Sequence, residues 1–226
     1  TDIRLEYDPY KYTSFPKNAG QQTYNLTRGI RKQMNRLKNA NRLSAFPPTL
    51  TFQSIADSTV KTDALVQRFY NRLEEGPHEL VLFDINRHAH IQPFLKSDFQ
   101  AFIDKLWIKP HLPYRLTLLT NVDENTSEIL ARTREAGREK IHLTKLGLRW
   151  PEGVYSLSHV ALPFSPDDPL YGNRRAARPS HGLNLGILEP RGETNMLHIP
   201  VQALMRLRYN PFFSYMEERI NALTRP

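Results

Sequence analysis

A near-continuous apolar run, Glu79–Ile85 (ELVLFDI), places the strongest constraint on the fold of this 226-residue chain. A strand that is apolar at almost every position has to be covered on both faces, as the strands of parallel sheets are. Two further runs, Leu50–Ala56 (LTFQSIA) and Tyr114–Val122 (YRLTLLTNV), predict strands before and after it. Because helical patterns separate these runs, the sequence predicts an α/β fold with a mostly parallel sheet and flanking helices.

The predicted helices lie between and after these strands. Thr62–Leu73 carries Leu65, Phe69 and Leu73 on one side, and Ser97 is placed to cap a helix over Asp98–Ile108. Glu124–Gly137 (ENTSEILARTREAG) is predicted as a third helix that ends at its glycine. The remaining predictions are a strand over Val154–Leu162, a hairpin around the turn Arg191–Glu193, and one or two helices over Val201–Leu223 with a break near Asn210–Pro211.

The first 46 residues differ from the rest of the chain. Leu26, Ile30, Met34 and Leu37 form one apolar helical stripe, and basic residues occupy the other face of the same helix. We expect residues 1–46 to be a loop and a basic amphipathic helix that act as a cap or linker, and residues 47–226 to be the α/β core. A helix of this kind can lie on an acidic membrane, but a packed helix with a solvated basic face is the interpretation we favour.

Composition excludes several classes of function. The chain has no cysteine, which removes disulfides, thiolate catalysis and cysteine zinc sites. Its net charge of +8 would suit an anionic partner, but no nucleic-acid-binding module accompanies the charge, so we expect no nucleic acid. The chain has no glycine-rich phosphate loop, so we expect no cofactor. Without a membrane-spanning run or a signal-peptide pattern, we expect a cytoplasmic protein, with peripheral membrane association as the alternative.

Asp57 and His159 are the two residues whose positions suggest chemistry. Asp57 follows the predicted strand Leu50–Ala56, where a carboxylate would stand at the carboxyl edge of the sheet. His159 lies in the segment SLSHV, and the proline-rich run after it (PFSPDDP, 163–169) would hold an imidazole rigidly. A carboxylate that orients an imidazole forms two members of a Ser-His-Asp triad.

Each residue also has a structural interpretation. Asp57 could cap the helix that follows it, and His159 could be a core histidine bonded to backbone. His88 and His90 are alternative bases, because they lie closer to Asp57 in the sequence. They could also supply two metal ligands, but no acidic or cysteine partners accompany them at metal spacing, so we expect a surface loop and no metal.

Both segments resemble a known family. PTLTFQSIADSTV (48–60) is similar to the acid-bearing strand and loop of α/β-hydrolases, with Ser54 where the family usually has glycine, and SLSHVALPFSPDD resembles the histidine motif of bacterial carboxylesterases and lysophospholipase-like hydrolases. The resemblance covers Glu6–Glu218 and implies the C-terminal half of an α/β-hydrolase. It implies that Asp57 is the acid, that His159 is the base, and that the substrate is an acyl ester or a lysophospholipid.

The chain departs from the family pattern in two ways. Asp57 and His159 lie about three times farther apart in the sequence than the family's acid and base, so the strand and helices between them would be an insertion. We prefer His159 to His88 because its flanking residues match the family motif. The chain also lacks the G-x-S-x-G turn that carries the nucleophile. We therefore expect the serine on an N-terminal half outside this chain, and we expect this chain alone to be inactive.

Two functions remain open from the sequence. The first is a serine ester hydrolase whose Asp57 and His159 act on a serine from the other half. The alternative is a non-catalytic binding module on a hydrolase scaffold. In either case the strand containing Leu50 and Phe52 is expected to have an unpaired edge, through which the chain would dimerise, aggregate or pair with its other half.

Overall fold

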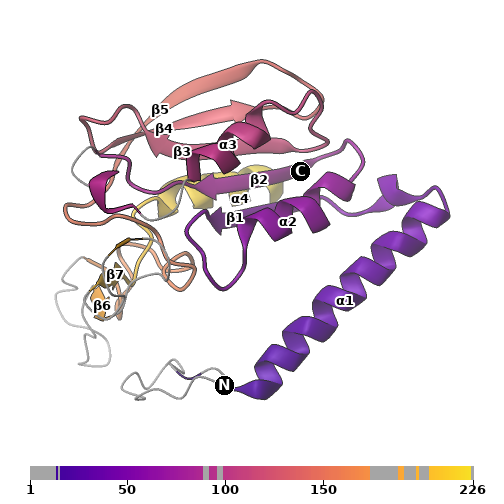
Figure 1. Cartoon of the computed structure of the whole chain (residues 1–226), viewed down its shortest axis with the longest axis horizontal. Coiled ribbons are helices and arrows are strands. Elements are labelled where there is room, and N and C mark those ends of the chain that lie inside the picture. Colours follow the sequence, from indigo (N-terminus) through magenta and orange to yellow (C-terminus); the bar gives the residue numbers. More distant parts are fainter. Residues whose placement is uncertain are drawn as a thin grey trace. The chain divides into compact units, whose positions relative to one another are not determined.

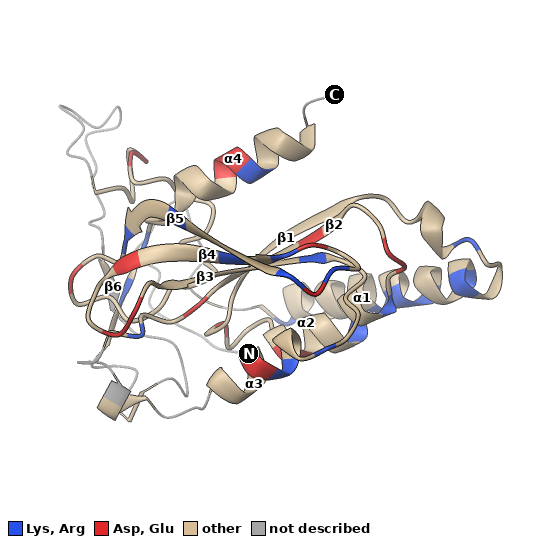
Figure 2. Ribbon diagram, turned by 90° about the horizontal axis from the view of Figure 1, so that it is seen from above, with Lys and Arg blue, Asp and Glu red and all other residues tan. Residues whose placement is uncertain are grey.

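The computed structural model of the chain describes residues 14, 16–88, 92–95, 99–173, 188–190, 197–198 and 204–224. The chain divides into two compact units, Thr1–Pro47 and Pro48–Pro226. The first unit contains the helix α1 (Lys17–Asn39) and a short 3-10 turn at Leu43–Ala45. Helix α1 lies where the apolar stripe predicts a helix, and Figure 2 shows Lys and Arg along it.

The second unit is built on a five-stranded sheet in the order β1-β2-β3-β4-β5 (Figure 1). Its strands are β1 (Thr49–Ser54), β2 (His78–Phe83), β3 (Arg115–Asn121), β4 (Glu128–Arg134) and β5 (Ile141–Arg149). Strands β1, β2 and β3 are parallel, whereas β4 and β5 are antiparallel to their neighbours. The predicted α/β class is confirmed, but the sheet is mixed rather than mostly parallel.

Helices cover both faces of this sheet. Helix α2 (Thr62–Arg68), extended by a 3-10 turn at Tyr70–Arg72, connects β1 to β2, and α3 (Phe99–Trp107) lies between β2 and β3. Figure 2 shows α2 and α3 on one face and α4 (Phe213–Thr224) on the other. This double cover explains why all six residues of β2 are buried.

The predicted helix over Glu124–Gly137 is wrong, because this segment forms β4 and the turn that leads to β5. Its alanine, leucine, glutamate and arginine favour a helix, but its side chains alternate in burial as those of a strand do. Ile129 and Ala131 pack in the core on the α4 face with Val81 and Phe83 of β2. Pairing with β3 has therefore overridden the local helix propensity.

The predicted strand over Val154–Leu162 is also wrong. Residues 154–158 are buried but irregular, and a turn follows from His159. The carbonyls of Val154 and Tyr155 accept hydrogen bonds from Asn86 instead of joining a ladder. Of the predicted hairpin, β6 (Leu188–Pro190) pairs with β7 (Met205–Leu207), whereas the turn 191–193 and all but residues 197–198 of the predicted second arm lie outside the described residues.

The two edges of the sheet differ in chemistry. Strand β5 carries His142, Lys145 and Arg149, and its pairing with β4 is interrupted by a register shift. Charges and bulges of this kind protect natural edges from further pairing. Strand β1 (TLTFQS) has no charged residue, and its pairing with β2 is regular over all six positions. In the described part of the chain, β1 has a neighbour on one side only.

Within the residues that the structure describes, no helix is both long and apolar enough to cross a bilayer.

Candidate functional site

Asp57 stands just beyond the carboxyl end of β1, where its carboxylate is held on several sides. Its Oδ1 accepts hydrogen bonds from the backbone N–H of Thr59 at 2.7 Å and of Val60 at 3.0 Å. Its Oδ2 accepts one from Gln53 Nε2 at 3.2 Å. Only 2% of the side chain is exposed. The carboxylate therefore fixes its own loop rather than capping α2, whose N-cap residue is Lys61.

The surroundings of Asp57 favour its ionised form. Burial raises the pKa of the carboxyl, but the contact with His159 and the backbone N–H groups of Val60 and Thr59 outweigh burial and lower the pKa below its usual value. Gln53, which the sequence analysis did not single out, also donates to the carbonyls of Ser54 and Val60. The sequence gives no signal for this role, because a glutamine in a strand has no characteristic pattern.

His159 contacts Asp57 directly. Its Nδ1 lies 3.3 Å from Asp57 Oδ1, although the residues are about a hundred positions apart in the sequence. The Nδ1 atom is buried and its alignment is looser than that of a formed hydrogen bond, whereas 34% of the side chain is exposed. Hydrogen bonds in unliganded active sites are commonly long in this way. The ring thus has one nitrogen against a carboxylate and part of its surface in solvent.

The turn that carries His159 is fixed from two sides. Ala161 N–H donates to the carbonyl of the buried Ser158 at 3.0 Å, and Arg206 Nη1 donates to Ser158 Oγ at 3.4 Å. Asn210, which is fully buried just before α4, donates from Nδ2 to the carbonyl of Leu162 and from its backbone N–H to that of Phe164. The histidine turn is therefore attached both to β7 and to the start of α4.

The proline-rich loop after His159 is tightly folded. Asp168 Oδ1 accepts hydrogen bonds from the backbone N–H groups of Leu170 and Tyr171, both at 2.9 Å. A Cβ atom at Gly172 would lie 2.4 Å from the carbonyl oxygen of Pro166 and 2.5 Å from that of Asp168, so only glycine fits there. The ring of Phe164 packs edge-on against Tyr171. This loop closes on itself and supports the adjacent histidine turn.

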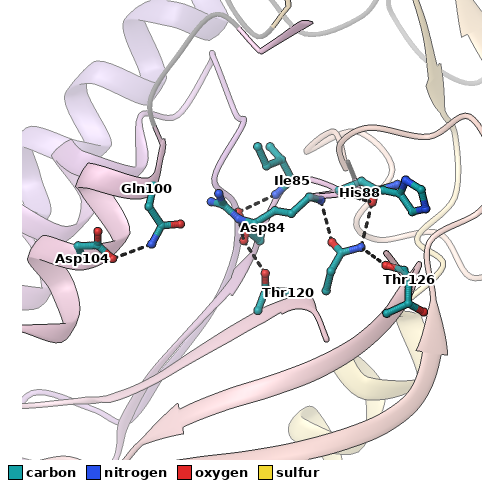
Figure 3. A network of polar contacts seen from close by, with 10 residues as sticks. Asp84, Ile85, His88, Gln100, Asp104, Thr120 and Thr126 are labelled. Carbon is teal, nitrogen blue, oxygen red and sulfur yellow. Dashed lines mark hydrogen bonds and ion pairs between the residues drawn. The ribbon is translucent and has the colours of Figure 1, made fainter. Parts of the chain in front are cut away.

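Two buried asparagines connect the sheet to the segment before His159. Asn86 donates from Nδ2 to the carbonyl of Val154 at 2.8 Å, and its backbone N–H donates to the carbonyl of Tyr155 at 2.8 Å. Asn121, at the end of β3, donates to Asn86 Oδ1 at 3.0 Å. Asn86 Oδ1 also accepts a hydrogen bond from the backbone N–H of His88, and Asn121 Nδ2 donates to the carbonyl of Thr126; His88 and Thr126 are labelled in Figure 3. The ends of β2 and β3 therefore position residues 154–155.

Asp84 is the other buried carboxylate at this edge of the sheet. It forms an ion pair with Arg87 and accepts hydrogen bonds from Thr120 Oγ1 at 2.7 Å and from the backbone N–H of Ile85 at 2.8 Å (Figure 3). These partners compensate its charge, and none of the three contacts involves Asp57 or His159. Asp84 therefore stabilises the junction of β2 and β3.

The alternative histidines have different surroundings. His88 lies beyond the end of β2, with its backbone N–H donating to Asn86 Oδ1, whereas His90 lies outside the described residues. No group of three or more metal-ligating side chains occurs among the residues with described positions.

Asp57 Oδ1 lies 3.3 Å from His159 Nδ1, an arrangement that can support a general base. A carboxylate on Nδ1 holds the imidazole in one tautomer, which leaves Nε2 to accept a proton from a hydroxyl group. Asp57 suits this role because it is buried and ionised. We searched protein-family models, curated proteins and solved structures for relatives of this chain, and none of the three comparisons gave a match.

Proposed function

We propose that this chain carries the acid and the base of a serine ester hydrolase. The observation behind the proposal is the 3.3 Å contact between Asp57 Oδ1 and His159 Nδ1 at the carboxyl edge of a parallel strand pair. In this mechanism Asp57 orients His159, and Nε2 of His159 removes the proton of a serine as its oxygen attacks the ester carbonyl. The imidazolium then protonates the departing alcohol, and water releases the acid from the acyl-serine in a second, equivalent step.

The proposal places the nucleophilic serine outside these 226 residues, because none of their serines lies in a G-x-S-x-G turn. The uncharged edge of β1, which has no neighbouring strand among the described residues, supports a specific location for it. A parallel strand added to this edge would run about 4.8 Å from β1 and would end beside Asp57. A serine in the turn after such a strand would come from the same edge of the sheet as His159.

The proposed substrate class follows from the family resemblance and from the charge of the chain. The resemblance to lysophospholipase-like hydrolases and the net charge of +8 favour an acyl ester with an anionic or phosphate-bearing group. We therefore propose a carboxylic ester, with lysophospholipids as the first substrates to examine.

The test compares histidine variants in the longest reading frame that contains these residues. Hydrolysis of 4-nitrophenyl acyl esters and of a lysophospholipid is measured for the parent, for His159→Ala and for His88→Ala. Loss of the base should lower kcat on the order of a thousandfold or more. His88→Ala should keep the parent rate, because the substitution leaves in place the backbone N–H of His88 that donates to Asn86 Oδ1.

Labelling with a fluorophosphonate, which reacts with activated serines, gives an independent measurement. We expect labelling of the longer protein, no labelling of this chain alone, and no labelling of the His159→Ala variant. If His88→Ala abolishes both activities and His159→Ala leaves them intact, the assignment of the base is wrong. If no serine is labelled in any form that has normal circular dichroism, the hydrolase proposal fails.

A further inference from the structure

A cavity lies on the α3 face of the sheet, away from Asp57 and His159. Its volume is 520 Å³, and neither of these residues lines it. Strands β3, β4 and β5 form its floor, and Gln100 and Ile103 of α3 form one wall. Figure 2 shows α2 and α3 on this face of the sheet. The cavity therefore occupies the strip of sheet beside α3.

The floor of the cavity is mostly aliphatic. Leu118 of β3, Leu130 of β4, and Ile141 and Leu143 of β5 all line it. Leu143 is 66% exposed, which is unusual for a leucine in the middle of a strand. Contiguous apolar surface of this kind in a concave site is typical of ligand-binding surfaces.

Arg132 supplies a positive charge beside this floor. Its guanidinium lies over the ring of Trp107, with 5.0 Å between Cζ and the ring centroid, and it lines the cavity. Among the described residues no carboxylate pairs with it. Stacking on an aromatic ring leaves the N–H groups at the edge of the guanidinium directed away from the ring and able to donate.

The polar end of the cavity is electrically balanced. Arg87 and Asp84 both line it, but they form an ion pair with each other, and Thr120 also donates to the Asp84 carboxylate (Figure 3). The pair therefore adds little net charge. Arg132 is the lining cation left to attract an anion, so the cavity has an aliphatic surface and one net positive charge.

We propose that this cavity binds an aliphatic monocarboxylate, such as a medium-chain fatty acid, with its carboxylate on Arg132 and its chain running from the neighbouring Leu118 and Leu143 along Leu130. A planar guanidinium forms two parallel hydrogen bonds with a carboxylate. The proposal does not depend on hydrolytic activity, because the cavity and the Asp57–His159 pair share no residue.

The size of the site suits this ligand. The register pairs Arg132 with Leu118 of β3 on one side and with Leu143 of β5 on the other, and Val122 lies four positions beyond Leu118. At about 3.3 Å per residue, the strip from Arg132 to Val122 is about 13 Å long. This length accommodates an extended chain of about ten to twelve carbons, and the volume of 520 Å³ lies in the range of small-molecule sites.

The test is a titration of the full chain with dodecanoate, in which binding is measured by calorimetry and by tryptophan fluorescence. Of the two tryptophans, Trp107 lies at Arg132 whereas Trp150 is buried in the core on the opposite face, so binding should change the emission of Trp107. Arg132→Gln should weaken dodecanoate binding about tenfold, since a charge-assisted pair is lost. It should leave binding of dodecanol unchanged, whereas Leu143→Asp should weaken binding of both ligands.

Two control variants separate this site from others. Arg149→Gln removes an exposed β5 arginine that does not line the cavity, and His159→Ala alters the proposed hydrolytic pair. Both should bind dodecanoate as the parent does. The proposal is overturned if no saturable binding occurs, if Arg132→Gln binds dodecanoate as tightly as the parent, or if His159→Ala is the variant that loses binding.

Discussion

Arg134 offers a sharp test of how the mixed sheet is held together. This β4 residue is 2% exposed, and its guanidinium donates hydrogen bonds to four backbone carbonyls, those of Trp107, Lys109, Pro110 and Arg138. The first of these carbonyls belongs to the last residue of α3, where helices leave carbonyls without internal partners. One side chain therefore joins the end of α3 and the turn after β4.

Replacement of Arg134 by methionine should destabilise the fold. The substitution removes the hydrogen-bond donors, whereas the four backbone carbonyls stay and lose their partner. Each unsatisfied buried acceptor costs about 1–3 kcal/mol, although entering water recovers part of this. We therefore expect Arg134→Met to lower the free energy of unfolding by about 3–5 kcal/mol, a large share of the roughly 5–15 kcal/mol typical of a domain. The free energy of unfolding of Arg134→Lys should lie between those of the parent and of Arg134→Met, because an ammonium group cannot reach all four acceptors as the forked guanidinium does.

The measurement is urea unfolding followed by circular dichroism and tryptophan fluorescence. The matched control is Arg149→Met, since Arg149 is 69% exposed and its ion pair with Glu128 is long, at 3.4 Å. An exposed pair of this kind contributes about 0–1 kcal/mol. If the free energy of unfolding of Arg134→Met lies within about 1 kcal/mol of that of the parent, the hydrogen bonds from Arg134 to the four carbonyls do not stabilise the fold.

Three further predictions concern the loop, the pH response and the sheet edge. Gly172→Ala should lower Tm, because its Cβ would lie 2.4 Å from the carbonyl oxygen of Pro166 and the loop would have to open; an unchanged Tm contradicts this. Burial lowers the pKa of His78 below 6.5, its value in an unfolded chain, so the unfolded state takes up a proton at this histidine more readily than the folded state. The free energy of unfolding should therefore fall as the pH drops below 6.5. His78→Asn should therefore flatten the change in urea midpoint between about pH 7.5 and 5.5, and an identical slope refutes the assignment. The parent should self-associate through the edge of β1, and Thr49→Lys should lower the molecular mass measured by light scattering. A parent that stays a monodisperse monomer at high concentration contradicts this prediction.

The three parallel strands were predictable from the sequence, whereas the two strands on the antiparallel side were not. The apolar runs around β1, β2 and β3 are short and bounded by polar residues, and this short length distinguishes a buried strand from a buried helix. Strand β4 carries residues with helix propensity, and the energy that makes it a strand comes from pairing with β3, which local sequence does not record. In β5, Ile141 and Leu143 alternate with polar residues, a signal that the prediction passed over.

The candidate site divides in the same way. Asp57 and His159 were predictable because their flanking residues are distinctive, and the structure places them 3.3 Å apart. Gln53 and Asn86 were not, because their roles depend on groups that folding brings near them: the carboxylate of Asp57 and the carbonyl of Val154. An amide side chain has no signature until its acceptor is known.

The bonds from Asn86 to Val154 and Tyr155 have a consequence for how the imidazole can move. Both bonds come from the rigid end of a central strand, and Asn121 on the next strand braces the same amide. The position of the histidine therefore depends on the sheet as well as on the turn that bears it. Sequence changes on the outer side of that loop should leave the imidazole in register, while a single change in the amide pair should displace it.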